Sequence, residues 1–332
     1  MSWTFRKPSG PYSATMGELD YVVVLAGGLS PEREISLRSG EQVSDALSEA
    51  GVQAVLADVD ASLLGRLRTD PPSAVFPVIH GAPGEDGSVG EVLGLLGIPY
   101  VGSLPTACRM AFDKPAAKAI TAAAGLRTPA SVSLPRDAFH DLGAAAVIDL
   151  IIGRLGVPLF VKPSRGGSAL GASAAHSAAD LAAAIVGCFG YGDTALIERL
   201  VLGTEIAVGV VDLGEGPRAL PAVEIVAPGG TYDYAARYTA GESEFYVPAR
   251  LPAEIAAEAA RVAVTAHTAL GLRDISRTDL IVDSAGAVHF LEVNVAPGMT
   301  STSTLPMAMR AAGIDLGACC VTLLERAADR VS

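Results

Sequence analysis

Short apolar runs alternate with amphipathic helical segments over the first third of the chain. Residues 21–26 (YVVVLA), 52–59 and 74–79 are apolar and rich in β-branched side chains, which is typical of buried strands. Residues 36–50 and 89–96 repeat apolar side chains at the spacing of one helical face. This alternation predicts a parallel sheet that helices cover on both faces.

The remaining two thirds predict a mixture of strands and helices. An irregular loop rich in glycine and tyrosine is expected over residues 229–248. With domain borders placed near residues 104 and 198, we expect a polar tail (1–20) and then domains over residues 21–104, 105–197 and 198–332. The expected elements are helices over residues 114–124, 144–155, 253–270 and 305–312, and strands over residues 159–162, 195–198, 205–211, 222–226, 277–283 and 288–293.

The composition is that of a globular protein, since 50% of the 332 residues are hydrophobic. A net charge of -12 argues against nucleic acid and anionic membranes as partners, because both reward clustered Lys and Arg. The 4 cysteines form no CxxC pair, so we expect buried free thiols rather than disulfides. Arg6 and Lys7 precede no apolar signal segment, and charges interrupt the apolar residues 142–161. These features predict a cytoplasmic protein.

Several common site motifs are missing from the sequence. It contains no GxxxxGK[ST] phosphate loop, no GxGxxG after the first strand and no GxSxG. Its His and Cys residues form no closely spaced set that is typical of zinc. P-loop enzymes, simple dinucleotide-binding proteins and serine hydrolases are therefore disfavoured.

A glycine-rich segment follows the strand that ends at Lys162 (KPSRGGSALGAS, residues 162–173). Gly166, Gly167 and Gly171 allow backbone N–H groups to approach phosphate oxygens, and Lys162 can neutralise a phosphate. The segment is also compatible with a plain surface hairpin loop.

Three oxygen ligands lie on the last two expected strands. Glu292 and Asn294 are two residues apart and therefore point to one face, which Asp279 joins if the two strands pair. Such ligands suit Mg²⁺, which binds through one or two carboxylates and substrate phosphates. A hydrogen-bonded strand end is the structural alternative.

Polar groups also follow two other strands. His80 ends the third strand and precedes Glu85 and Asp86, so it is either a functional group or a satisfied structural one. Gly298 begins a run of hydroxyl side chains (GMTSTS), which can offer donors to an anion or can cap the next helix.

In this order, the motifs resemble those of the D-alanine–D-alanine ligase family within the ATP-grasp superfamily. The resemblance covers residues 22–313 and includes AGGLSPEREISLRSG, HGAPGEDGSVG, FDK, KPSRGGSALG, IERLVLGTE, YDYAARY, SRTDLIVD and FLEVNVAPGMTSTS. It implies an α/β fold of the ATP-grasp type with three domains. These would be an N-terminal parallel-sheet domain for substrate, a central ATP-grasp subdomain and a C-terminal catalytic subdomain.

The resemblance also implies how ATP, the co-substrate, and its metal ions are bound. Two Mg²⁺ ions, with Mn²⁺ as an alternative, would be held by Asp279, Glu292 and Asn294. Adenine would contact one glutamate and the backbone that follows it, two lysines would hold phosphates, and a mobile loop would close over them. The implied ATP contacts are Lys114 and Lys162 for phosphate, Ser168 in the loop, Glu198, Arg199 and Val201 for adenine, and Glu205 for ribose.

For the amino acids, the resemblance implies binding and catalytic residues. Glu32 would bind the ammonium group of the first D-alanine, and His80 would lie near its carboxylate. Arg277 and the Gly298 amide would stabilise the oxyanion. Ser303 and Tyr238 would border the second substrate. The implied substrate set is Glu32, His80, Arg277, Gly298 and Ser303, and the implied catalytic set is Glu32, Ser168, Tyr238, Arg277 and Gly298. The implied partners are ATP and D-alanine, and the implied assembly is a homodimer.

The reaction implied by the resemblance joins two D-alanines through an acyl phosphate, for peptidoglycan precursors. The sequence departs from the family pattern at Gly166, Ala169, Arg237, Thr302 and Thr304. Because Thr304 borders the second-substrate pocket, a ligase for another amino-acid pair, or for a D-alanine–D-lactate ester, is the alternative. A regulatory protein without catalysis is a further alternative, which the intact charged motifs disfavour.

Overall fold

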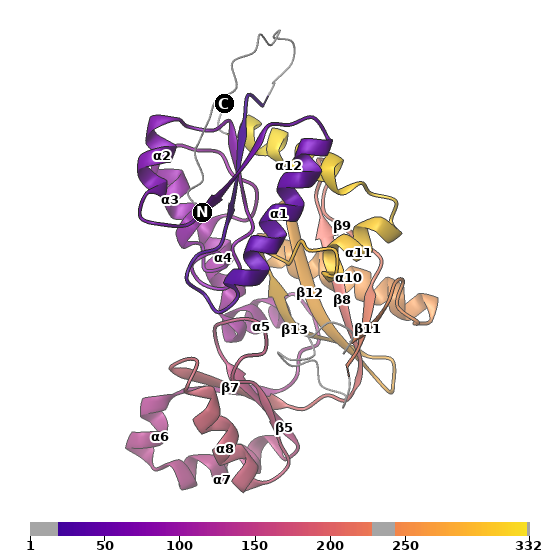
Figure 1. Cartoon of the computed structure of the whole chain (residues 1–332). Coiled ribbons are helices and arrows are strands. Elements are labelled where there is room, and N and C mark those ends of the chain that lie inside the picture. Colours follow the sequence, from indigo (N-terminus) through magenta and orange to yellow (C-terminus); the bar gives the residue numbers. More distant parts are fainter. Residues whose placement is uncertain (1–18, 228–242, 331–332) are drawn as a thin grey trace.

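The computed structural model describes residues 19–227 and 243–330, and three sheets organise these residues (Figure 1). The parallel N-terminal sheet and the two antiparallel sheets confirm the expected mixed α/β fold. Most of the polar tail, and the two residues Arg237 and Tyr238, lie outside the described part of the chain.

The first sheet is parallel and has the strand order β2-β1-β3. Alternate residues of its central strand build two cores. Val22 and Val24 pack with α1 on one face, and Val23 and Leu25 pack with α2 and α3 on the other. The elements are β1 (Val22–Ala26), α1 (Arg33–Glu49), β2 (Ala54–Asp58), α2 (Leu63–Thr69), β3 (Ala74–Pro77) and α3 (Ser88–Leu95).

A helix from much later in the chain completes this domain. α12 (Leu316–Asp329) lies beside α1 and covers the same face of the sheet (Figure 1). The two helices approach closely at Gly317, where a Cβ atom would lie 2.5 Å from the carbonyl oxygen of Ala46. Cys320 is buried in this core, and all 4 cysteines are buried free thiols, as expected.

The second sheet forms a separate lobe, at the bottom of Figure 1. It is antiparallel with the order β4-β7-β5-β6, and helices pack against it around a core that includes Leu159 and Leu181. The expected border at 197/198 falls inside β7. The elements are β4 (Ser131–Pro135), α6 (Arg136–Leu142), α7 (Ala144–Leu155), β5 (Leu159–Pro163), β6 (Ser173–Ala175), α8 (Ala178–Cys188) and β7 (Thr194–Arg199).

The third sheet has the order β11-β10-β8-β12-β13, with β9 paired to β8. Two helices from the expected central domain, α4 and α5, pack against this sheet together with α10. β11 lies within residues 229–248, where only an irregular loop was expected. The elements are α4 (Pro105–Phe112), α5 (Lys114–Ala123), β8 (Gly203–Val211), β9 (Arg218–Ala219), β10 (Val223–Val226), β11 (Glu244–Tyr246), α10 (Ala253–Ala269), β12 (Ile275–Asp283), β13 (Val288–Asn294) and α11 (Thr304–Ala311).

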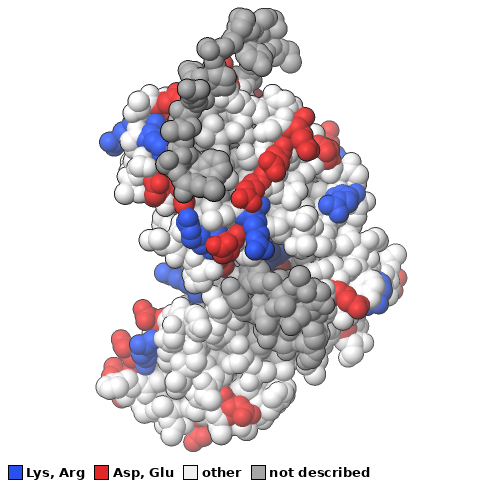
Figure 2. Space-filling view, viewed as in Figure 1, with Lys and Arg blue, Asp and Glu red and all other residues white. Residues whose placement is uncertain are grey.

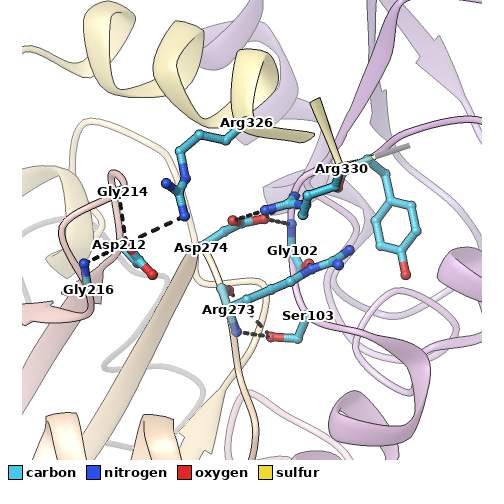
Figure 3. Close-up of polar contacts among 10 residues, drawn as sticks. Gly102, Ser103, Asp212, Gly214, Gly216, Arg273, Asp274, Arg326 and Arg330 are labelled. Carbon is cyan, nitrogen blue, oxygen red and sulfur yellow. Dashed lines mark hydrogen bonds and ion pairs between the residues drawn. The ribbon is translucent and has the colours of Figure 1, made fainter. Parts of the chain in front are cut away.

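A buried carboxylate fixes the start of β12 to the first domain (Figure 3). Asp274 is 1% exposed, and its side chain accepts hydrogen bonds from Gly102 N at 2.7 Å and from Arg330 Nη1 at 2.7 Å. Arg330 also donates to the carbonyl oxygen of Tyr100, and Arg273 donates to that of Gly102. The strand that carries the candidate metal ligands is therefore fastened to the connector after the first sheet.

The surface drawn in Figure 2 carries a row of acidic side chains over α1. Glu41, Asp45 and Glu49 are exposed there at helical spacing. Among the described residues, no single helix has the length and hydropathy to cross a membrane, and one bent pair, α11 with α12, meets these criteria jointly.

Candidate active site

Two of the cavities in the described chain adjoin one another. The inter-sheet cavity, of about 620 Å³, lies between the second and third sheets and includes Phe160 and Val201 in its wall. The strand-end cavity, of about 600 Å³, is bounded by α1, the glycine-rich loop and the loop after β13. These volumes are typical of small-ligand sites. The residues that line both are Lys114, Gly166, Gly167, Ile225, Asp279 and Glu292, so ligands in the two cavities can meet there.

The predicted metal ligands share one face of the third sheet. Asp279 of β12 pairs with Glu292 of β13, and Arg277 pairs with Asn294. The register then shifts by one residue after Asp279. This bulge lets Leu291 line the inter-sheet cavity directly beside Glu292, although neighbouring strand residues normally face opposite ways. The expectation that the three ligands lie on one face is confirmed.

The oxygen atoms of these residues fit Mg²⁺ as a partial site. Asn294 Oδ1 accepts from Ala296 N at 2.8 Å, and the Asp279 carboxylate is held by Arg277. Within residues 19–227 and 243–330, no group of three or more His, Cys, Asp or Glu side chains is arranged to hold a metal ion. Since Mg²⁺ commonly takes one or two carboxylates and completes its shell with phosphate and water, Asp279 and Glu292 are the residues that would supply the charged ligands.

Two lysines face the region that the cavities share. Lys162 Nζ lies 3.0 Å from Glu198 Oε1 and 3.6 Å from Glu292 Oε2. Lys114 Nζ lies 4.0 Å from Glu292 Oε2 and donates to the Gly166 carbonyl at 2.6 Å. Burial opposes the charge on Lys162, but the carboxylates of Glu198 and Glu292 outweigh burial and raise its pKa. Lys162 thus stays cationic, as a phosphate ligand must.

The glycine-rich loop is fastened to the first domain by one buried hydrogen bond. Ser168 donates to Glu32 Oε1 at 2.6 Å, and both side chains are buried. Two glycines lie close to this carboxylate: a Cβ atom would lie 2.7 Å from Glu32 Oε1 at Gly167 and 2.3 Å from Oε2 at Gly81, and Gly81 also has a φ of +71°. The segment connects the antiparallel strands β5 and β6, so it is a hairpin loop, and its residues Gly166 and Gly167 also line both cavities.

His80 uses both ring nitrogens within the protein. Nε2 lies 3.0 Å from Ser39 Oγ, and Nδ1 lies 2.9 Å from the carbonyl oxygen of Ala296. Because the Ala296 carbonyl can only accept, the proton of the neutral ring is on Nδ1, and Nε2 accepts from the Ser39 hydroxyl, whose oxygen accepts from Met299 N at 3.1 Å. Burial lowers the pKa of His80 to about 4. His80 therefore lines the strand-end cavity as a neutral group that holds the loop after β13.

Glu85 is a buried carboxyl in the wall of the same cavity. It accepts from Gly81 N at 3.0 Å. Burial, and next the negative charge of Glu32, raise the pKa of Glu85 to about 7. Near neutral pH the cavity thus contains a carboxyl group that can exist with or without its proton.

The loop after β13 serves as cavity wall and helix cap together. Ser303 is the N-cap residue of α11, and its Oγ accepts from Thr300 N at 3.2 Å. Gly298 packs so tightly that a Cβ atom there would lie 2.7 Å from Ser303 Oγ. Both residues line the strand-end cavity. Ser303 takes the N-cap position without a side-chain capping hydrogen bond, and donation to an anion stays a prediction.

The residues proposed to contact adenine and ribose line the inter-sheet cavity, away from the strand-end cavity. Glu205 on β8 is in register with Ile281 on β12, and both line the cavity. The Arg199 side chain donates to the Leu155 carbonyl at 2.6 Å. Leu200 N donates to Pro158 O at 3.1 Å, and the next residue, Val201, lines the cavity.

The structure brings together every described residue of the predicted site, and it adds others. Lys118, one helical turn after Lys114, forms an ion pair with Glu198 that the sequence analysis missed. The i, i+4 spacing of the two lysines on α5 was the available signal. Arg38 lines the strand-end cavity from α1; it belongs to the motif AGGLSPEREISLRSG but was given no role in the sequence analysis.

Comparisons with known proteins identify related ligases. The family model described as "D-ala D-ala ligase C-terminus" matches residues 120–325. A D-alanine--D-alanine ligase of Bordetella petrii is 40% identical over 94% of this chain and 94% of its own length. That of Pelotomaculum thermopropionicum is 40% identical over 89% of this chain and 92% of its own.

Solved structures with related sequences have the same fold. The D-Ala:D-Ser ligase VanG from Enterococcus faecalis is 29% identical and matches with a TM-score of 0.79, over 92% of this chain and 98% of its own. A D-alanine--D-alanine ligase from Bacillus anthracis is 27% identical and matches with a TM-score of 0.78, over 94% and 98%. The expected ATP-grasp fold is thereby confirmed, and the chain belongs to the D-alanine–D-alanine ligase family of ATP-dependent ligases.

Proposed function

We propose that this enzyme joins two D-alanine molecules to D-alanyl-D-alanine and converts ATP to ADP and phosphate, in the cytoplasmic synthesis of peptidoglycan precursors. The observation that carries the proposal is the meeting of two cavities at Asp279, Glu292 and Lys114. A nucleotide in the inter-sheet cavity would present its terminal phosphate there. A carboxylate in the strand-end cavity would meet that phosphate at the same place.

In the proposed first step, the donor carboxylate attacks the terminal phosphate of ATP. Lys114 and Lys162 would orient the phosphates, and Glu32 would bind the donor ammonium group. Mg²⁺, held by Asp279, Glu292 and Asn294, would neutralise charge on the phosphates. The product is an acyl phosphate, whose phosphate is a good leaving group.

In the proposed second step, the acceptor amine attacks the acyl carbon and phosphate departs. The oxyanion that forms would be stabilised by Arg277 and by the amide of Gly298, since both line the strand-end cavity. Water must be excluded from the acyl phosphate meanwhile. The Ser168–Glu32 hydrogen bond supports such closure, because it holds the glycine-rich loop over the cavity.

One observation at the acceptor end supports D-serine as an alternative acceptor. Thr304 lines the strand-end cavity, and its buried Oγ1 has no hydrogen-bond partner among the described residues. After a side-chain rotation, this hydroxyl could pair with a serine hydroxyl. A D-Ala:D-Ser ligase is also among the similar structures.

An ester product is less compatible with the sequence. In ester-forming relatives, the resemblance places a histidine where this chain has Tyr238. A partly cationic histidine would repel an ammonium group, whereas a tyrosine with an ordinary pKa near 10 imposes no such repulsion. We therefore expect a dipeptide rather than a D-lactate ester at pH 7.

The test is a coupled assay with purified protein, Mg²⁺-ATP and D-alanine, followed by competition among D-alanine, D-serine and D-lactate as acceptors. We expect D-alanine-dependent release of ADP and phosphate and a dipeptide product. Release of AMP and pyrophosphate would exclude the acyl-phosphate route, and an ester as main product would refute our reading of Tyr238. The family resemblance also implies a homodimer, which sedimentation would test.

A further inference from the structure

Glu198 is a buried carboxylate that two lysines share. Its side chain is 3% exposed, and Lys162 lies 3.0 Å from its Oε1. The other oxygen, Oε2, accepts from Lys118, which is 4% exposed. Lys118 lies on α5, and the ion pairs connect Lys118 to Glu198, Glu198 to Lys162 and Lys162 to Glu292.

The two lysines differ in what else they can reach. Lys162 lines the inter-sheet cavity and contacts the candidate metal ligand Glu292. Lys118 is not part of either cavity wall, and its described ion pair is with Glu198. Lys162 is thus the cation that a nucleotide can recruit, and Lys118 is a fixed partner behind the site.

Nucleotide binding would therefore leave the negative charge of Glu198 partly unbalanced. When the phosphates attract Lys162, the Glu198 carboxylate loses a share of its positive partner. A buried carboxylate left without a cation is strongly destabilised, because neither water nor a counter-charge replaces what it lost. Glu198 would then hold Lys162 back and weaken phosphate binding.

We infer that Lys118 is a positioning residue for ATP: its ion pair neutralises Glu198, so that Lys162 can turn from Glu198 to the phosphates. The inference rests on the proposed role of Lys162 in phosphate binding. It assigns to Lys118 an effect on nucleotides that carry phosphate and no effect on the choice of amino acid.

The experiment compares Lys118→Met, Lys118→Arg and Glu198→Gln, each alone, with the double variant K118M/E198Q, all in the full chain. We expect K118M to raise the KM for ATP and the Kd for ADP at least about tenfold, since it leaves a buried charge unpaired. The KM for D-alanine and kcat at saturating ATP should change less than about threefold, and binding of adenosine should weaken less than binding of ADP. K118R should recover most of the ADP affinity.

The double variant decides whether Lys118 acts through Glu198. In the E198Q background no buried carboxylate needs a cation, so we expect K118M to change the Kd for ADP less than about twofold there. An equal loss of ADP and adenosine binding, or the same effect of K118M in both backgrounds, would overturn the inference. If K118M alone fails to fold, Lys118→Gln takes its place in both backgrounds, and an equal change in the Kd for ADP with and without E198Q overturns the inference.

Nucleotide binding is measured without amino acids. A wrong assignment of the acceptor would therefore leave the ADP results unchanged, so the two failures are distinguishable.

Discussion

Arg277 and Asp279 form a two-pronged ion pair on one face of β12. Nε donates to Oδ1 at 2.7 Å, and Nη2 donates to Oδ2 at 2.9 Å. Residues two apart on a strand point the same way, so this pairing is built into the strand itself. The proposed oxyanion donor and a proposed metal ligand therefore hold each other in place.

Replacement of Arg277 by Met should lower kcat by roughly a hundred- to a thousand-fold, because it removes a fixed donor at the developing oxyanion. The Kd for ADP should change much less, since Lys114 and Lys162 remain. Steady-state kinetics and calorimetry measure the two effects. Arg277→Lys is the matched variant. Its kcat should fall between those of the unmodified protein and R277M, because it keeps the charge and loses the paired geometry. Near-normal turnover of R277M would refute the assignment.

Replacement of Glu292 by Gln should make turnover depend on much higher Mg²⁺ concentrations. The metal ions have only two charged protein ligands in the proposed site, so the loss of one weakens binding severely. A titration of activity against Mg²⁺ measures the shift. The matched control is Glu258→Gln on α10, whose carboxylate pairs with Arg261 far from the cavities. An unchanged Mg²⁺ dependence in E292Q would count against the metal assignment.

Glu85 should make the folded protein less stable as the pH rises. Its pKa is about 7 in the folded protein, raised by burial and then by Glu32, against an ordinary value of 4.5. Between these values the folded chain keeps a proton that the unfolded chain has lost. Stability is therefore lost from about pH 4.5 upward, and the loss levels off above about pH 7. At most, the effect is about 3 kcal/mol.

Glu85→Gln removes this titration and can still accept from Gly81 N. Its thermal stability relative to the unmodified protein should improve between about pH 5 and pH 8, as scanning calorimetry would measure. Glu258→Gln should show no such trend between about pH 5 and pH 8, because hydrogen bonding to Arg261 lowers the pKa of that partly exposed carboxyl and its effect on stability changes only below about pH 4.5. A pH-independent difference for E85Q would contradict the prediction.

Arg330→Met should lower the free energy of unfolding by about 2 kcal/mol, because Asp274 loses its cation in a buried setting. Arg326→Met is the matched control on the same helix side. Arg326 lies 3.6 Å from Asp212, whose carboxylate also accepts from Gly214 N and Gly216 N (Figure 3). Arg326→Met should lower the free energy of unfolding by less than about 1 kcal/mol. Urea unfolding of both variants is the measurement, and equal effects would show that Asp274 does not depend on Arg330.

Much of the site could be predicted because strand periodicity fixes direction. The spacing of Glu292 and Asn294 placed both on one face, and pairing with β12 added Asp279. The bulge could not be predicted, since nothing in FLEVNV distinguishes a regular strand from one that shifts register. As a result, Leu291 was not recognised as a neighbour of Glu292 in the cavity wall.

Contacts between distant segments were the main omission. The helix that contains Lys118 was expected, but its partner Glu198 lies 80 positions later, on another sheet. His80 was read as a group near the substrate carboxylate. Its hydrogen bonds to Ser39 and Ala296 depend on the docking of α1 against the loop after β13. Local patterns indicate which side chains are available, and the tertiary fold decides which of them meet.

The packing of α12 on α1 has a consequence for biosynthesis. The face of the first sheet that carries Val22 and Val24 is closed partly by Cys320 and Leu324. A ribosome delivers these two residues only after both antiparallel sheets have left the exit tunnel. The domain that is translated first therefore stays open on one side through most of elongation, with apolar surface available to chaperones. During synthesis, the core of the first sheet can be completed only after the residues of α12 have been added.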